Sequence, residues 1–114
     1  MIVWKRSLRS VRQNKVLSLI GLSARAGRLK SGEFSVENAI KGGKAALVLV
    51  AQDASDNTKK LFFDKCSFYG IPVFEYGTKE MLGHAVGKEF RASIAVLDEG
   101  LAKTIISHLE GLVE

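Results

Sequence analysis

The sequence predicts a layered α/β sandwich built from one domain, and three observations support this prediction. The chain has 114 residues, which is the length of an ordinary domain and enough to bury a hydrophobic core. Hydrophobic residues make up 46% and charged residues 25%, as in an average globular protein, so the composition does not indicate disorder. Segments with helical periodicity alternate with short apolar runs of strand length, which is typical of α/β layers.

The first half of the chain predicts two helices and two strands. Asn14 suits the N-cap of a helix that ends before Gly27. A short extended stretch at 29–31 leads into a second helix at 34–41, which a pair of glycines ends. The continuous apolar run at 46–51 is typical of a central strand that is covered on both faces.

The next segments predict a long helix and a strand. The helix at 56–69 carries an apolar stripe that contains Phe62, Cys66 and Tyr69. A cysteine on such a stripe is expected to be a buried core thiol rather than a nucleophile. The strand at 73–76 begins directly after the only proline of the chain, a position that a strand tolerates.

The last segments predict a short helix, a strand and a closing helix. Thr78 suits the cap of the short helix, which ends at Gly87. A second continuous apolar run at 92–97 predicts the last strand. The closing helix is expected to begin at Asp98 or Glu99, because acidic residues favour the first turn of a helix.

The charge of the chain is unevenly distributed. The formal net charge is +5, from 17 basic and 12 acidic residues. Eight basic residues and no acidic residue precede Glu33, whereas residues 31–114 hold nine bases and all 12 acids and so carry −3. A basic front end on a mildly acidic body points to a polyanionic partner.

Residues 1–13 are interpreted as a basic N-terminal arm and residues 14–114 as a single domain. The arm fits a short amphipathic helix or a segment that becomes ordered on binding. Its partner is expected to be RNA, with an anionic membrane surface as a weaker alternative, because the apolar face is short. The accessory basic residues of the arm are Lys5, Arg6, Arg9 and Arg12.

Motifs for metal binding, cofactor binding or catalysis are absent from the sequence. Soft or imidazole ligands are limited to Cys66, His84 and His108, which have neither CxxC nor HxxxH spacing. The Gly-Gly-Lys segment at 42–44 lacks the pattern of a phosphate-binding loop, because alanine follows the lysine. We therefore expect no metal, no cofactor and no enzymatic activity.

The sequence also bears on the cellular compartment. No apolar run approaches the roughly 18 residues of a membrane span, so no transmembrane segment is expected. The first residues lack the apolar core and small-residue cleavage site of a signal peptide. A single cysteine fits a reducing compartment, and we expect the protein to be cytoplasmic.

Basic residues cluster around the predicted second helix. Lys30 precedes Gly32 and the start of this helix, and Lys41 and Lys44 follow at its end. A helix start offers free backbone N–H groups and a positive potential, which suit a phosphate or a base edge. The clustering favours nucleic acid as the partner, although each base alone also fits a solvated face.

Seven short motifs are together typical of one known family. They are Leu-Ser-Leu-Ile-Gly-Leu-Ser-Ala-Arg-Ala-Gly at 17–27, Ser-Gly-Glu at 31–33, Lys-Ala-Ala-Leu-Val-Leu-Val-Ala-Gln-Asp-Ala-Ser at 44–55, Asn-Thr-Lys-Lys at 57–60, Gly-Ile-Pro-Val at 70–73, Leu-Gly at 82–83 and Gly-Lys-Glu at 87–89. With them the chain resembles the kink-turn-binding ribosomal protein superfamily (the L-seven-Ae and L-thirty-e group), specifically its small bacterial YlxQ-like branch. The resemblance implies a three-layer α/β/α sandwich with a mixed sheet of about four strands, and no enzymatic activity.

The resemblance also implies where RNA binds. In that family a Gly-x-Asn-Glu-x-x-Lys motif at the start of the second helix holds kink-turn RNA. Here Gly32 matches, whereas Phe34, Ser35 and Asn38 stand in the Asn, Glu and Lys places. Phe34 either stacks on an unpaired base, which is worth about 1–3 kcal/mol, or is partly buried in the core. Ser35 and Asn38 still offer hydrogen bonds. Because the motif departs from the family pattern at three positions, a ligand other than a standard kink-turn is also open.

The second RNA contact of the family is the loop before the last strand, which corresponds to residues 87–91. Family members present apolar side chains there to a flipped-out base. In this chain Lys88, Phe90 and Arg91 offer phosphate, stacking and cation contacts instead. We expect the loop to lie beside the helix start and to form one RNA-facing edge with it.

The leading interpretation is a non-enzymatic RNA-binding protein of ribosomal-protein type. It would recognise structured RNA, either ribosomal RNA or a kink-turn-like element, through the helix start and the loop. The alternative is a protein-interaction module on the ribosome or the translation machinery that uses the same edge. The candidate RNA-binding residues are Lys30, Gly32, Glu33, Phe34, Ser35, Asn38, Lys41, Lys44, Lys88, Phe90 and Arg91.

Overall fold

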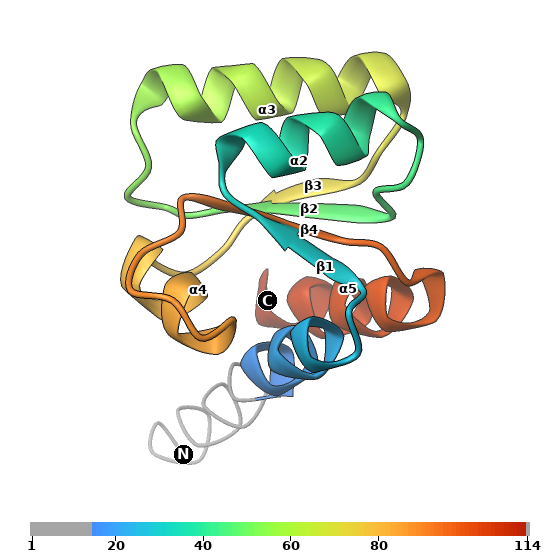
Figure 1. The fold of residues 1–114 in the computed structure, drawn as a ribbon, viewed down its shortest axis with the longest axis vertical. Coiled ribbons are helices and arrows are strands. Elements are labelled where there is room, and N and C mark those ends of the chain that lie inside the picture. Colours follow the sequence, from blue (N-terminus) through green and yellow to red (C-terminus); the bar gives the residue numbers. More distant parts are fainter. Residues whose placement is uncertain (1–14, 114) are drawn as a thin grey trace.

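The computed structural model describes residues 15–113 and contains a four-stranded sheet between two layers of helices (Figure 1). The predicted three-layer sandwich with a mixed sheet is therefore confirmed. The predicted arm at 1–13, with Lys5, Arg6, Arg9 and Arg12, lies outside the described residues, as does the predicted cap Asn14.

The sheet is mixed and has the strand order β1-β4-β2-β3. Its strands are β1 (Leu29–Ser31), β2 (Leu47–Val50), β3 (Val73–Glu75) and β4 (Ser93–Val96). β4 runs antiparallel to both β1 and β2, whereas β2 and β3 are parallel. The last strand of the chain therefore lies in the interior of the sheet and joins β1 to the rest of it.

The two middle strands form the centre of the core. Every residue of β2 and β4 is buried, as predicted for apolar runs covered on both faces. In the ladder Val48 and Lys30 both pair with Ala95, so β4 fixes the register of both its neighbours. The observed strands are one residue shorter at each end than the predicted 46–51 and 92–97.

Helices cover both faces of the sheet (Figure 1). On one face lie α2 (Glu33–Lys41) and α3 (Asp56–Tyr69). On the other face lie the first helix, described over residues 15–25, together with α4 (Lys79–Ala85) and α5 (Glu99–Val113). None of the described helices is long and apolar enough to cross a membrane.

Side chains cap three of the helices. The hydroxyls of Ser55 and Thr78 each accept a hydrogen bond at 3.1 Å from the backbone N–H three residues later, at the starts of α3 and α4. Asp98 Oδ1 accepts from the backbone N–H of Leu101 at 2.8 Å, so Asp98 rather than Glu99 caps α5. Because these caps are formed by residues of characteristic type next to each helix, the sequence alone predicts where the three helices begin.

The apolar stripe of α3 is narrower than predicted. Phe62 and Cys66 are fully buried, whereas Tyr69 is 44% exposed at the end of the helix. Burial raises the pKa of the Cys66 thiol to about 11 and that of the Tyr76 hydroxyl to about 12. Cys66 is therefore a core thiol, as the sequence predicts, and is not activated as a nucleophile.

We expect the free energy of unfolding to fall as the pH rises from about 9 to about 11. The unfolded thiol of Cys66 ionises near its ordinary pKa of 9.0, while the folded protein keeps the proton up to about 11. In this window the unfolded state binds fewer protons, so alkali favours it. Urea titrations of the wild type and of Cys66→Ala measure the effect, and an equal pH slope for both would contradict it.

Candidate functional site

The sheet brings the two predicted binding segments together. The start of α2 follows β1, and the loop at 87–91 precedes β4, the neighbour of β1. The Gly32 N–H donates to the Ser93 carbonyl oxygen at 3.0 Å, so the first residue before α2 lies against the first residue of β4. Both segments lie on the left-hand side of Figure 1, and they form the single edge that the sequence predicts.

Arg91 links the loop to the helix start. Its Nε donates to the Ser31 Oγ at 3.1 Å, and its Nη1 donates to the Phe90 carbonyl oxygen at 2.8 Å. The Arg91 N–H also donates to the carbonyl oxygen of Lys79, the first residue of α4, at 2.9 Å. The guanidinium of Arg91 thus ties the two segments together, in addition to carrying positive charge at the edge.

The turn at Gly32 sets the direction in which α2 begins. Its φ of 92° lies in a region that glycine adopts without strain. No side chain caps α2, so the N–H groups of its first turn have no side-chain acceptor. A Cβ at residue 32 would lie 4.0 Å from the Arg91 Nε, so the Arg91 side chain lies in contact distance of this turn.

Two aromatic side chains are exposed on this edge. Phe34 is 78% and Phe90 51% exposed, although large apolar side chains are usually buried. The alternative that Phe34 is partly buried in the core is therefore wrong. Val36, Ala39 and Ile40 form the buried face of α2, and a residue two positions before Val36 points to the opposite side of the helix.

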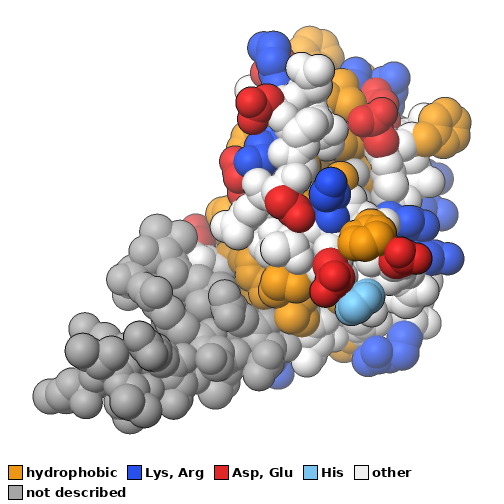
Figure 2. All heavy atoms as spheres, turned by 90° about the vertical axis from the view of Figure 1, so that its left-hand side faces the viewer, with side chains coloured by type: hydrophobic (Ala, Val, Ile, Leu, Met, Phe, Trp, Pro, Cys, Tyr) orange, Lys and Arg blue, Asp and Glu red, His pale blue; other side chains and the backbone are white. Residues whose placement is uncertain are grey.

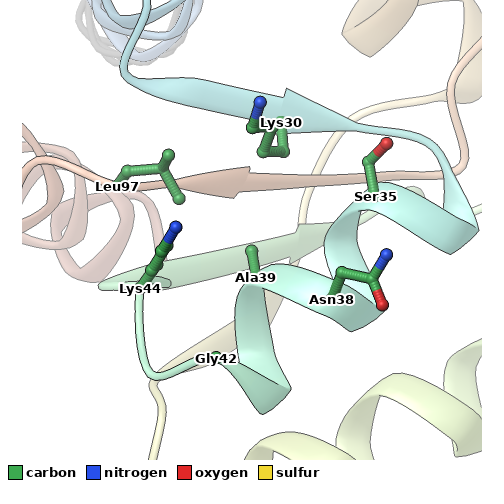
Figure 3. Close-up of a pocket in the computed structure, with 7 residues that line it drawn as sticks. All are labelled: Lys30, Ser35, Asn38, Ala39, Gly42, Lys44 and Leu97. Carbon is green, nitrogen blue, oxygen red and sulfur yellow. The ribbon is translucent and has the colours of Figure 1, made fainter.

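Several of the predicted polar residues surround a hollow between α2, β1 and the segment after α2 (Figure 3). Its volume is about 320 Å³. The residues that line it are Lys30, Ser35, Asn38, Ala39, Gly42, Lys44 and Leu97.

Lys41 lies apart from this hollow. Its Nζ is 3.9 Å from a carboxylate oxygen of Glu37, which also pairs with Lys65 at 3.6 Å. The structure thus brings four of the predicted polar residues together and places Lys41 in an ion-pair cluster of its own.

The loop at 87–91 packs directly on α4, a contact that the sequence analysis missed. A Cβ at Gly83 would lie 2.6 Å from the Glu89 carbonyl oxygen and 2.8 Å from Phe90 Cα. The Lys88 N–H also donates to the Gly83 carbonyl oxygen at 2.8 Å. The Leu-Gly motif at 82–83 was visible in the sequence, but nothing local indicated which backbone would lie against it.

The face that contains this edge is not uniformly basic. Figure 2 shows hydrophobic, basic and acidic side chains interspersed across the side at which α2 begins. Beside Phe90 lies a second hollow, which Asp53, Thr78, Lys79 and Glu80 also line. Within residues 15–113 no group of three or more His, Cys, Asp or Glu side chains is placed to hold a metal ion.

Known proteins are similar to this chain in sequence and in fold. The chain is 42% identical over 92 residues to RNA-binding protein YlxQ of Bacillus subtilis (strain 168), covering 81% of this chain and 92% of the relative. It is 32% identical over 101 residues to large ribosomal subunit protein eL8 of Thermoplasma acidophilum, covering 84% of each chain. A solved structure, described as a protein with unknown function from Bacillus halodurans C, is 43% identical with a TM-score of 0.81, covering 84% of this chain and 97% of that one.

A family model matches most of the chain as well. The model of the Ribosomal protein L7Ae/L30e/S12e/Gadd45 family matches residues 14–106, from the first helix into α5. The match spans both segments of the edge described above. The chain therefore belongs to the Ribosomal protein L7Ae/L30e/S12e/Gadd45 family.

Proposed function

We propose that this protein binds structured RNA through the edge formed by the start of α2 and the loop at 87–91. The observation that carries the proposal is the pair of exposed aromatic side chains, Phe34 and Phe90, beside hydrogen-bond donors on one edge. The names of the relatives support it, because one is called an RNA-binding protein and another a large ribosomal subunit protein. The role would be non-enzymatic and cytoplasmic, with ribosomal RNA as the first candidate ligand.

The chemistry of the edge favours RNA with unpaired bases. An exposed phenylalanine ring binds a base by stacking, and only unstacked nucleotides present such a face. Ser35 and Asn38 add hydrogen bonds, but Phe34 has no polar atom for a base edge. We therefore propose a bulged or kinked RNA, with a standard kink-turn as one member of this class.

A fluorescence titration tests the proposal. The ligands are a kink-turn RNA, the same duplex with an ordinary internal bulge, and a straight duplex, each at two salt concentrations. We expect both RNAs with unpaired bases to bind more tightly than the straight duplex at high salt, where backbone attraction is weakened. Equal affinity for all three would contradict recognition of unpaired bases, and no binding to any would contradict the proposal as a whole.

The proposed domain at 14–114 would carry the specific contacts, with the arm at 1–13 as an accessory. Removal of the arm deletes four basic residues. The slope of log K against log salt should then fall by at most about 3–4 units, at roughly 0.7–0.9 per phosphate contact. Salt titrations of the full chain and of the shortened chain measure this, and an unchanged slope would show that the arm does not contact the RNA.

A further inference from the structure

We propose that the hollow between α2 and β1 is the seat of one RNA phosphate, held by Lys30 and Lys44 from its two sides. The inference rests on the proposed function and names the group that this part of the edge binds. The two lysines come from different elements, one from β1 and the other from the segment after α2 (Figure 3). They would clamp the phosphate, while the aromatic side chains of the edge would stack on bases.

Neither lysine is neutralised by an ion pair within residues 15–113. The ion pairs of the described residues involve Lys41, Lys59, Lys60 and Lys65, and neither Lys30 nor Lys44 takes part in one. Among the described residues, no acidic side chain lines the hollow. Lysine side chains from two elements line one space, and an anion held there would be attracted to both of them.

The remaining polar groups of the hollow also suit an anion. Ser35 and Asn38 lie one helical turn apart on α2 and line the same space. Within residues 15–113 neither side chain has a hydrogen-bond partner, so the Ser35 hydroxyl and the Asn38 amide are free to donate. The Nζ groups of the lysines add only donors, and a phosphate offers only acceptors to such a set.

Small residues keep the space open. Ala39 and Gly42 line it from α2 and its C-cap, and Leu97 adds an apolar wall. The volume of about 320 Å³ is at the lower end of ligand sites and has room for one phosphate with part of its sugar. A Cβ at Gly42 would lie 3.2 Å from the Asn38 carbonyl oxygen, so a larger residue there would press on the backbone at the end of α2.

The position of the hollow fits an RNA strand that also meets Phe34. Phe34 lies in the first turn of α2 and Lys44 beyond its last residue, and the nine residues of the helix span about 14 Å at 1.5 Å per residue. The hollow beside Phe90 is less suitable for a phosphate, because Asp53 and Glu80 line it. The contact with the phosphate backbone of the RNA is therefore assigned to the α2 side of the edge.

Substitution of the lysines tests the seat. Lys30→Gln, Lys44→Gln and the double variant are titrated with the RNA that the wild type binds most tightly, over a range of salt. We expect the salt slope to fall by about 0.7–0.9 in the double variant and by less in each single variant, because the remaining lysine still faces the same phosphate. Lys103→Gln is the matched control, since Lys103 is exposed on α5 and has no ion pair, and it should leave the slope unchanged.

RNAs with one neutral methylphosphonate linkage locate the contact. We expect one linkage to weaken wild-type binding strongly and to have no effect on the double variant. A double variant that is weakened by the same linkage as the wild type, or that keeps the wild-type salt slope, would overturn the seat but leave RNA binding intact. A wild type that binds none of the RNAs would overturn the proposed function and this inference together.

Inorganic phosphate identifies the source of the bound group. Added alone, it should shift the amide signals of Ser35 and Asn38 only at concentrations far above those of the RNA. Saturation at micromolar phosphate would assign the hollow to a free anion and would overturn the assignment to RNA.

Discussion

Gly83→Ala is expected to displace the loop at 87–91 and to weaken both folding and RNA binding. The new methyl group would lie 2.6 Å from the Glu89 carbonyl oxygen, 2.7 Å from its carbonyl carbon and 2.8 Å from Phe90 Cα. All three are backbone atoms, so no side chain can rotate away to relieve the clash. Overpacking of this kind costs about 1–3 kcal/mol of folding free energy.

Two measurements separate the local effect from a general loss of stability. Urea unfolding measures the free energy of unfolding. RNA titration well below the unfolding transition measures how far the displaced loop lowers the RNA affinity of the folded protein. Gly100→Ala in α5 is the matched control, because its methyl group would meet only the Asp98 side chain at 3.3 Å. That control should lose less stability than Gly83→Ala, because a small shift of one side chain relieves its contact whereas the backbone contacts at Gly83 have no such relief. Gly83→Ala with wild-type stability and wild-type affinity would contradict the packing described here.

Phe34→Ala and Phe90→Ala are each expected to weaken RNA binding by about 1–3 kcal/mol, or about 5- to 150-fold. Each substitution removes a ring that would stack on an unpaired base. Stability should change little, because the rings are 78% and 51% exposed and contribute little to the core. Fluorescence titration with the kink-turn and bulged RNAs measures the loss, and thermal unfolding checks the fold.

Phe68→Ala is the matched control for these variants. Phe68 is 82% exposed, but it lies at the far end of α3 from the start of α2 (Figure 1). This variant should bind RNA like the wild type. If Phe34→Ala and Phe90→Ala also bind RNA like the wild type, the stacking role is contradicted. Loss of a nuclease-resistant protein complex in the same variants would then favour the alternative of a protein-interaction module.

Local sequence signals were sufficient for most of the fold. The bounds of α3 were predicted to the residue, because the Ser55 hydroxyl caps its start and Gly70 ends it at a φ of 70°. The continuous apolar run around β2 predicted a central strand, because a strand that is covered on both faces buries every one of its side chains. These elements depend on interactions between residues that are close in the chain.

The candidate site was only partly predictable, because its geometry depends on residues far apart in the chain. The two segments of the edge were identified by resemblance, but the link from Arg91 to Ser31 joins residues 60 positions apart. Periodicity does not state which strand pairs with which, so it could not place this link. The orientation of Phe34 was also open, because three other residues of α2 are sufficient to fill the core face.

The central position of β4 has a consequence for how the protein is made. β1 and β2 both pair with a strand that ends at Val96, so a nascent chain shorter than this leaves β1 without any partner in the sheet. Contacts between such distant segments form late, after their full loop-closure entropy has been overcome. Co-translational folding of this sheet is therefore delayed until most of the chain has emerged, and truncated products would not assemble the edge.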